Sequence, residues 1–251
     1  MQFESSWLNA ISESLTKGWT VRKECRALTL RSWIVAACLL LATLVLLRGS
    51  IYPFLATTQP AQSGILVVEG WLSEHFYKEV AELCRNSRYR RVLIVLAIYD
   101  GDLYYDSAGL AYDDYIRWVA VQQGVPADRV HVVLGRPTRR DRTFHTARLA
   151  RRWLAEHEPN AAAVDVATEG PHARRSRLLY QKAFGDRTRV GVIALTEQTY
   201  DPDRWWQYSS GIRDVFSETI AYIHTLILFR PPDPPDDDTP FVIPRKSESL
   251  P

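Results

Sequence analysis

The residues best suited to chemistry lie in one stretch, at residues 168–177. It reads Thr-Glu-Gly-Pro-His-Ala-Arg-Arg-Ser-Arg and follows an apolar run at residues 163–167. The apolar run predicts a buried strand, and the stretch predicts a helix that opens with a His and several Arg. A helix N-terminus attracts anions through its unpaired N–H groups and its dipole. Because Arg pairs with phosphate through two bonds, the stretch predicts an anion site; the alternative is an ordinary basic, solvated first turn.

Two further candidate groups follow other apolar runs. Glu69, Gly70 and Trp71 come after the run at residues 65–68, where a glycine lets the backbone turn sharply and approach a ligand. Residues 136–143 come after the run at 130–134 and contain four Arg and one Asp. Thr143, at the end of this loop, could cap the next helix. All three groups therefore follow a predicted strand.

The elements that must position these groups alternate along residues 64–230. Strands that are apolar on both faces and alternate with helices indicate a parallel sheet covered on both sides. With right-handed crossovers this gives a Rossmann-like, doubly wound α/β domain with a sheet of about five strands. We expect strands at 65–68, 92–97, 130–134, 163–167 and 190–195, and helices at 73–88, 108–124, 143–158, 172–184 and 211–229.

In such a sheet, ligands bind beyond the carboxyl ends of the strands, at the topological switch point. With the strand order 3-2-1-4-5, Glu69 and His172 face one cleft, and Arg142 lies nearby. His172 could act as a general acid and Glu69 as a general base. Since neighbouring helical residues diverge by about 100°, Arg174 and Arg175 cannot both point inward, and we favour Arg175. The expected ligand-binding residues are Gly70, Trp71, Arg142, Thr143, Thr168, Gly170, Arg174 and Arg175.

Several of these features have a structural alternative. Glu69 could form a buried ion pair with Arg142 or Arg175 that only positions loops. Trp205 and Trp206 are more typical of a packing anchor, although aromatic walls also hold sugars and lipids. The aspartates in the loop at residues 99–106 resemble a cation site only loosely. No His or Cys spacing indicates metal ligands, and no Gly-x-Gly-x-x-Gly follows the first strand, so we expect neither a metal nor a cofactor.

An apolar segment near the N-terminus predicts a membrane anchor. Residues 32–47 are apolar, and flanking residues can complete the length needed for a span. The alternatives are a buried core helix or a cleaved signal peptide. Basic residues are frequent before the segment, whereas only Arg48 follows closely, which predicts a cytoplasmic N-terminus. We therefore expect a cytoplasmic segment at 1–31, a transmembrane anchor at 32–55, a linker at 56–63, an extracytoplasmic domain at 64–230 and a disordered Pro/Asp-rich tail at 231–251.

Four motifs follow one another along the chain. They are Val67-Val68-Glu69-Gly70-Trp71-Leu72, Asp141-Arg142-Thr143-Phe144, Gly170-Pro171-His172-Ala173-Arg174-Arg175-Ser176, and Trp205-Trp206 with Ser209, Ser210 and Glu218. Together they resemble the ElyC/SanA/YdcF family of bacterial envelope proteins. The likeness covers roughly residues 64–225 and is strongest to the branch whose first strand ends in Glu-Gly-Trp. One difference is that residues 143–147 read Thr-Phe-His-Thr-Ala, where the family often has Thr-Tyr-Glu-Asn-Ala.

The resemblance implies a tethered Rossmann-like domain in the bacterial cell envelope. It implies a link to the lipid-carrier steps of peptidoglycan or surface-polysaccharide synthesis, and it maps the family's His-x-x-Arg pair onto His172 and Arg175. We expect a single-pass protein of the bacterial inner membrane that binds a phosphorylated small molecule or a polyprenyl-phosphate lipid. A hydrolase or transferase and a non-catalytic envelope scaffold are the alternatives. The net charge of only +2 gives no case for nucleic-acid binding, and protein partners stay unknown.

Overall fold

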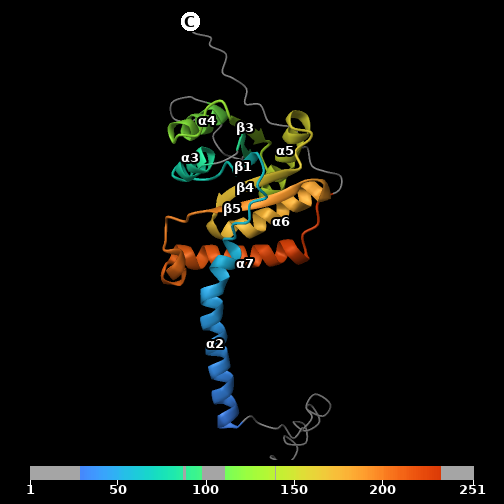
Figure 1. The fold of residues 1–251 in the computed structure, drawn as a ribbon. Coiled ribbons are helices and arrows are strands. Elements are labelled where there is room, and N and C mark those ends of the chain that lie inside the picture. The colour runs from blue at the N-terminus through green and yellow to red at the C-terminus, as the bar shows by residue number, and fades with distance from the viewer. Residues whose placement is uncertain (1–28, 87–88, 98–110, 139, 233–251) are drawn as a thin grey trace, which may run out of the picture. The chain divides into compact units, whose positions relative to one another are not determined.

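The computed structural model describes residues 29–86, 89–97, 111–138 and 140–232 (Figure 1). The chain divides into two compact units, Met1–Val45 and Leu46–Pro251. The expected cytoplasmic segment up to residue 28, the aspartates of the loop at 99–106 and the tail from residue 233 lie outside the described residues.

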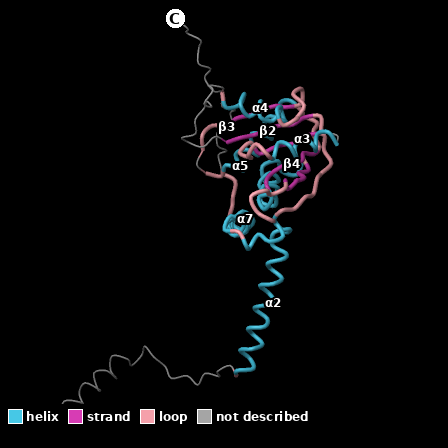
Figure 2. The backbone as a smooth tube through the Cα atoms, turned by 90° about the vertical axis from the view of Figure 1, so that its left-hand side faces the viewer, coloured by secondary structure: helices cyan, strands magenta, loops and turns pink. Residues whose placement is uncertain are grey.

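The second unit is built on a five-stranded parallel sheet (Figures 1 and 2). Its strand order is β3-β2-β1-β4-β5, as the sequence predicts. Strands β1 and β4 are neighbours at the centre, and Val67 of β1 lies opposite Val166 of β4. The strands are β1 (Ile65–Glu69), β2 (Arg91–Ala97), β3 (Val130–Gly135), β4 (Ala163–Glu169) and β5 (Arg189–Leu195).

Helices cover both faces of the sheet because its strands are apolar on both sides. The helices α3 (Phe76–Asn86) and α4 (Tyr112–Gln122) pack on the face that carries Leu66 and Val68. The helices α5 (Arg142–His157) and α6 (Ala173–Phe184) pack on the face that carries Val67. This confirms the Rossmann-like, doubly wound α/β class and places the switch point between β1 and β4.

The helix α2 (Leu30–Leu55) is 26 residues long and is apolar enough to cross a membrane. The described part of the chain holds no second helix of this kind. Its most apolar window has a mean hydropathy of 2.3 and is not buried. The alternative interpretation of this segment as a buried core helix is therefore wrong. Length and composition fit a transmembrane helix.

The last residues of α2 belong to the second unit and pack on its C-terminal elements. There Leu55 shares a small core with Trp205 of the 3₁₀ segment η3 (Pro202–Gln207) and with Val215 of α7 (Ser209–Ile227). The indole N–H of Trp205 donates to the carbonyl of Arg48 at 3.1 Å. The Arg48 guanidinium lies 4.1 Å from the centre of the Trp206 ring. Both tryptophans therefore anchor the end of α2, as the packing interpretation predicts.

The expected linker is held along the edge of the sheet. Gln59 pairs with Val192 of the edge strand β5 through two backbone hydrogen bonds of 2.8 and 3.1 Å. The buried carboxylate of Asp165 accepts hydrogen bonds from the N–H groups of Ala61 and Ser63. A Cβ at Gly191 would lie only 2.1 Å from the Ala61 nitrogen, so this close approach requires glycine. The linker is thus fixed to the domain.

Candidate functional site

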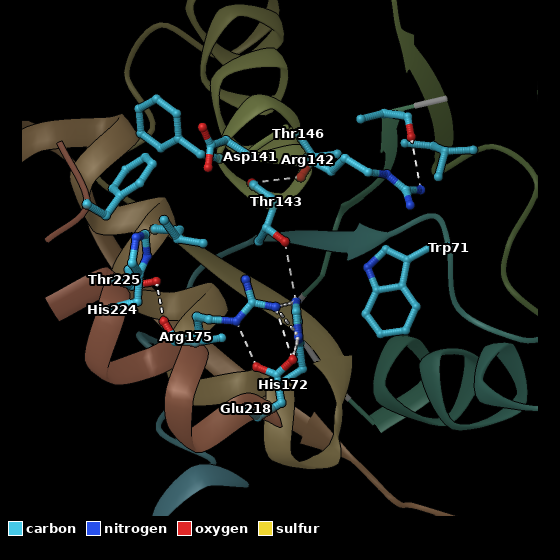
Figure 3. A pocket seen from close by; sticks show the side chains of 16 residues that line it. Trp71, Asp141, Arg142, Thr143, Thr146, His172, Arg175, Glu218, His224 and Thr225 are labelled. Atoms are coloured by element: carbon cyan, nitrogen blue, oxygen red, sulfur yellow. Dashed lines mark hydrogen bonds and ion pairs between the residues drawn. The ribbon is translucent and has the colours of Figure 1, made fainter. Parts of the chain in front are cut away.

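A cavity of about 500 Å³ opens at the carboxyl ends of the central strands (Figure 3). Its wall combines polar and apolar side chains, which come from the sheet, from α5, α6 and α7 and from the segments beside them. The polar part of the wall is the set Asp141, Arg142, Thr143, Thr146, His172, Arg175, Glu218, His224 and Thr225. The apolar part is the set Trp71, Leu96, Ala97, Phe144, Leu179, Ala221 and Phe229.

His172 is the centre of the polar part. It ends the 3₁₀ turn η1 (Gly170–His172), which connects β4 to α6. Its Nδ1 lies 3.0 Å from Glu218 Oε1, and its Nε2 lies 3.5 Å from Glu69 Oε2. The Thr143 hydroxyl lies 3.4 Å from the same Nε2, and the Trp71 ring meets the imidazole edge to face at 5.2 Å. Each ring nitrogen therefore has a carboxylate within reach, which suits proton transfer.

Glu69 reaches His172 from beneath the cavity. It ends β1, has no exposed surface and is absent from the cavity wall. Its carboxylate accepts hydrogen bonds from Thr168 Oγ1 at 2.6 Å, Ser176 Oγ at 3.0 Å and Trp71 Nε1 at 3.2 Å. These donors fix the carboxylate toward the imidazole. Glu69 thus lies next to His172 across the switch point, but it is buried beneath the cavity, whereas the sequence predicted that it faces the cleft.

Arg175 and Glu218 form the strongest ion pair of the site. Two parallel bonds of 2.7 and 3.0 Å join the guanidinium to the carboxylate. Burial by itself raises the pKa of Glu218, but the hydrogen bonds and charges of His172 and Arg175 outweigh it and hold this pKa at about 2. The alternative in which Arg175 pairs with Glu69 is therefore wrong, because Arg175 pairs with Glu218. As Figure 3 shows, His172, Arg175 and Glu218 point toward one another.

The other predicted residues divide between the cavity wall and its supports. Arg142 and Trp71 line the cavity, and Arg142 Nη2 donates to the carbonyl of Ala97 at 3.3 Å. Arg174 points away from it: Nε donates to the carbonyl of Phe54, and the guanidinium lies 4.0 Å from the Phe54 ring centre. This agrees with the preference for Arg175 over Arg174.

The three remaining predicted ligand-binding residues do not reach the cavity either. Thr168 is fully buried, and its hydroxyl donates a hydrogen bond to the Glu69 carboxylate. Gly70 is also buried, and its N–H donates to the carbonyl of Val95. Gly170 has a φ of +21°, and a Cβ there would lie 2.9 Å from the Tyr52 hydroxyl. These residues therefore shape the turns that carry the site.

One prediction about a helix start is wrong and another is confirmed. Thr143 does not cap α5, because the helix begins at Arg142 and Asp141 occupies the cap position with a left-handed φ of 49°. The helix expected from about residue 172 is α6, which starts at Ala173 with His172 at its cap position, directly after η1. The cavity wall from this region is made by the side chains of His172, Arg175 and Leu179. The polar wall is thus formed by side chains from several elements.

A smaller hollow of about 220 Å³ lies beside His172 and is acidic. Glu169, Asp214, Ser217 and Glu218 line it. Burial and the neighbouring Glu197 carboxylate raise the pKa of Glu169 to about 8, so Glu169 holds a proton at neutral pH. A neutral Glu169 reduces the repulsion among the carboxylates near His172.

Glu218 is the main site residue that is missing from the predicted catalytic and ligand-binding residues, although it occurs in one of the motifs. The helical pattern of residues 211–225 indicated that it lies on a buried face. Positions 211, 215, 218, 222 and 225 recur at spacings of three and four, so they share one face of α7. In the structure Gly211, Val215 and Thr225 are buried on that face. An acid on a buried face needs a cationic partner, and Arg175 supplies it.

Among the described residues, no group of three or more His, Cys, Asp or Glu side chains is arranged to hold a metal ion. The sequence matches no protein-family model. It also matches no curated protein. The geometry of the site therefore carries the functional argument.

Proposed function

We propose that this protein is a membrane-anchored cell-envelope protein whose domain binds a phosphate- or pyrophosphate-bearing amphiphile, with a polyprenyl-phosphate carrier as the main candidate. The observation that carries the proposal is a single cavity whose wall combines cationic and hydroxyl-bearing side chains with large apolar ones. Arg142, Thr143 and His172 offer donors for phosphate oxygens. Phe144, Leu179 and Phe229 offer a surface for hydrocarbon.

The charges around His172 define how such a ligand is held. Glu218 neutralises Arg175 and faces His172, so the polar wall carries fixed donors without a large excess of positive charge. Such a wall recognises phosphate by direction as well as by charge, because the donors are already oriented before binding. Arg142, at the first residue of α5, adds a further cation to the wall.

The membrane part of the proposal rests on α2 and its flanks. The helix is long and apolar enough to span a bilayer. The excess of basic residues before it favours a cytoplasmic N-terminus and an extracytoplasmic domain. The resemblance to the ElyC/SanA/YdcF family supports the bacterial inner membrane and a role in lipid-carrier-linked peptidoglycan or polysaccharide metabolism.

The test is a binding measurement with full-length protein in nanodiscs. A short-chain polyprenyl pyrophosphate is titrated and compared with the alcohol that lacks the phosphates. We expect binding of the pyrophosphate only. Arg175→Ala and a His172→Ala, Arg175→Ala double variant are expected to lose most of the affinity, because Arg175 orients His172 and Glu218 in the polar wall. Arg174→Ala is the matched control, because Arg174 is the adjacent arginine and contacts Phe54 instead of the cavity. Equal affinity for both ligands, or equal losses in both arginine variants, would refute the proposal.

A second candidate function is hydrolysis or group transfer on the same ligand. The observation in its favour is the placement of His172 between Glu69 and Glu218, which gives the imidazole a carboxylate at each nitrogen. In hydrolysis, water would attack the terminal phosphorus and give up its proton to solvent, and the bond from that phosphorus to the bridging oxygen would break. His172 would protonate the leaving bridging oxygen, and Glu69 would hold the ring in place. Release of phosphate from the bound pyrophosphate by wild-type protein, abolished in His172→Ala, supports this function. Binding without any release selects the binding function alone.

A further inference from the structure

The helix α7 exposes a stripe of large apolar side chains. It consists of Ile212, Phe216, Ile220, Ile223 and Ile227, with exposed fractions of 41, 56, 67, 49 and 70%. Their spacings of four, four, three and four residues place them within an arc of about 80° on the helix. The opposite side of α7 faces the domain through Val215, Glu218 and Thr225. One helix therefore has a face toward the domain and an apolar face directed outward.

This stripe is too regular to be scattered surface residues. Single exposed apolar side chains are normal, whereas contiguous apolar patches mark contacts with proteins or membranes. An outward apolar face on a helix, with polar groups on the other side, is the pattern of helices that lie in a membrane interface.

The end of α2 identifies the membrane as the partner. Leu55 and Ile51 pack in the same small core as Val215 of α7, and the Phe54 ring meets Tyr222 of α7 edge to face at 5.7 Å. If α2 spans the bilayer, its last turn lies at the headgroup level. Because α7 contacts this turn directly, α7 is at the headgroup level as well.

The side chains around this contact are those of a membrane interface. Arg48 extends over the Trp206 ring, and Tyr208, which precedes α7, is 41% exposed. Tryptophan and tyrosine gather at the boundary between lipid and water, and arginine near the end of a span reaches toward the headgroups.

We propose that α7 lies in the outer surface of the bilayer, with the stripe in contact with lipid at a depth of about 5–10 Å. This inference rests on the part of the proposed function in which α2 spans the membrane, and it does not depend on the ligand. It has a consequence for the cavity, because Glu218, Ala221 and Thr225 of the same helix line the cavity wall. A phosphate carried by a membrane lipid then reaches the polar wall without leaving the bilayer surface.

The test places a fluorescent probe on the stripe of the full-length protein in nanodiscs. Cysteine replaces Phe216 or Ile220 in a background in which Cys25 and Cys38 are alanine, and an environment-sensitive dye is attached. Cys84 stays, because it is buried. The matched control is Trp118→Cys on α4, an exposed apolar position at 52% on a helix that Figure 1 shows at the other end of the domain from α7.

Lipids that carry a nitroxide quencher near the headgroup report contact with the bilayer. We expect blue-shifted emission and strong quenching at positions 216 and 220, and neither effect at position 118. Unquenched emission at both stripe positions overturns the inference. Efficient disulfide formation between two copies through position 220 also overturns it, because the stripe is then an interface between proteins. Binding of polyprenyl pyrophosphate is measured separately, so loss of binding with intact quenching would refute the ligand proposal alone.

Discussion

Replacing Glu218 by Gln tests how much the ion pair at the centre of the site stabilises the domain. Gln keeps the shape of the side chain but removes the charge that faces Arg175 and His172. In the folded protein the pKa of Glu218 lies at about 2, compared with its ordinary value of 4.5. At about 1.4 kcal/mol for each pH unit, this difference corresponds to a stabilisation of about 3 kcal/mol. The side chain is only 16% exposed, so solvent screens the interaction weakly.

The pH dependence of this stabilisation has a definite sign. Because the folded-state pKa is lower than the unfolded one, the stabilisation is complete above about pH 4.5 and disappears as the pH falls toward about 2. We therefore expect Glu218→Gln to lower the free energy of unfolding by about 3 kcal/mol at pH 7 and by much less at about pH 3. The pKa of Glu158 is also lowered, by hydrogen bonds from Arg90 and Arg91, but its contribution is the same in both proteins and cancels.

The assay is urea unfolding of the full-length protein in detergent micelles, followed by tryptophan fluorescence over this pH range. The matched control is Glu156→Gln, which removes an exposed ion pair to Arg152 on α5. Exposed pairs contribute only about 0.2–1 kcal/mol, so the control is expected to change little. If Glu218→Gln lowers the free energy of unfolding by the same amount at every pH, or by no more than Glu156→Gln does, the Arg175–Glu218 pair does not stabilise the domain as the geometry indicates.

Three further predictions concern the residues around the site and the linker. Asp165→Ala is expected to lower the free energy of unfolding by about 3 kcal/mol, because it removes the buried acceptor of the linker N–H groups at Ala61 and Ser63; urea unfolding measures this, and a change below that of Glu156→Gln would contradict it. Gly191→Ala is expected to lower the free energy of unfolding by about 1–3 kcal/mol, since its Cβ would lie 2.1 Å from the Ala61 nitrogen of the linker. An unchanged midpoint of thermal unfolding would show that the linker is not fixed to the domain. Glu169→Gln is expected to stabilise the protein at alkaline pH and not at acidic pH. The raised pKa of about 8 means that wild-type protein loses stability as the pH rises from about 4.5 through about 8, and a difference that grows toward acidic pH would refute this assignment.

The sequence by itself determined the class of the fold and the position of its elements. Apolar runs at 65–68 and 163–167 predicted buried strands of a sheet covered on both faces, and the helical periodicity between them predicted the crossovers. The parallel order then brought Glu69 to His172, because both follow central strands at the switch point. Local pattern and the handedness of the connections were sufficient for these features.

Only the tertiary structure decided which charged groups act together. Arg174 and Arg175 are adjacent and chemically identical, yet one contacts Phe54 at the end of α2 and the other pairs with Glu218 of α7. The helical pattern places Glu218 on one face of α7, but the partner of Glu218 and the outward stripe depend on the elements against which α7 packs. Long-range packing selects among side chains that local pattern leaves equivalent, and here it placed one face of α7 on the cavity and left the other exposed.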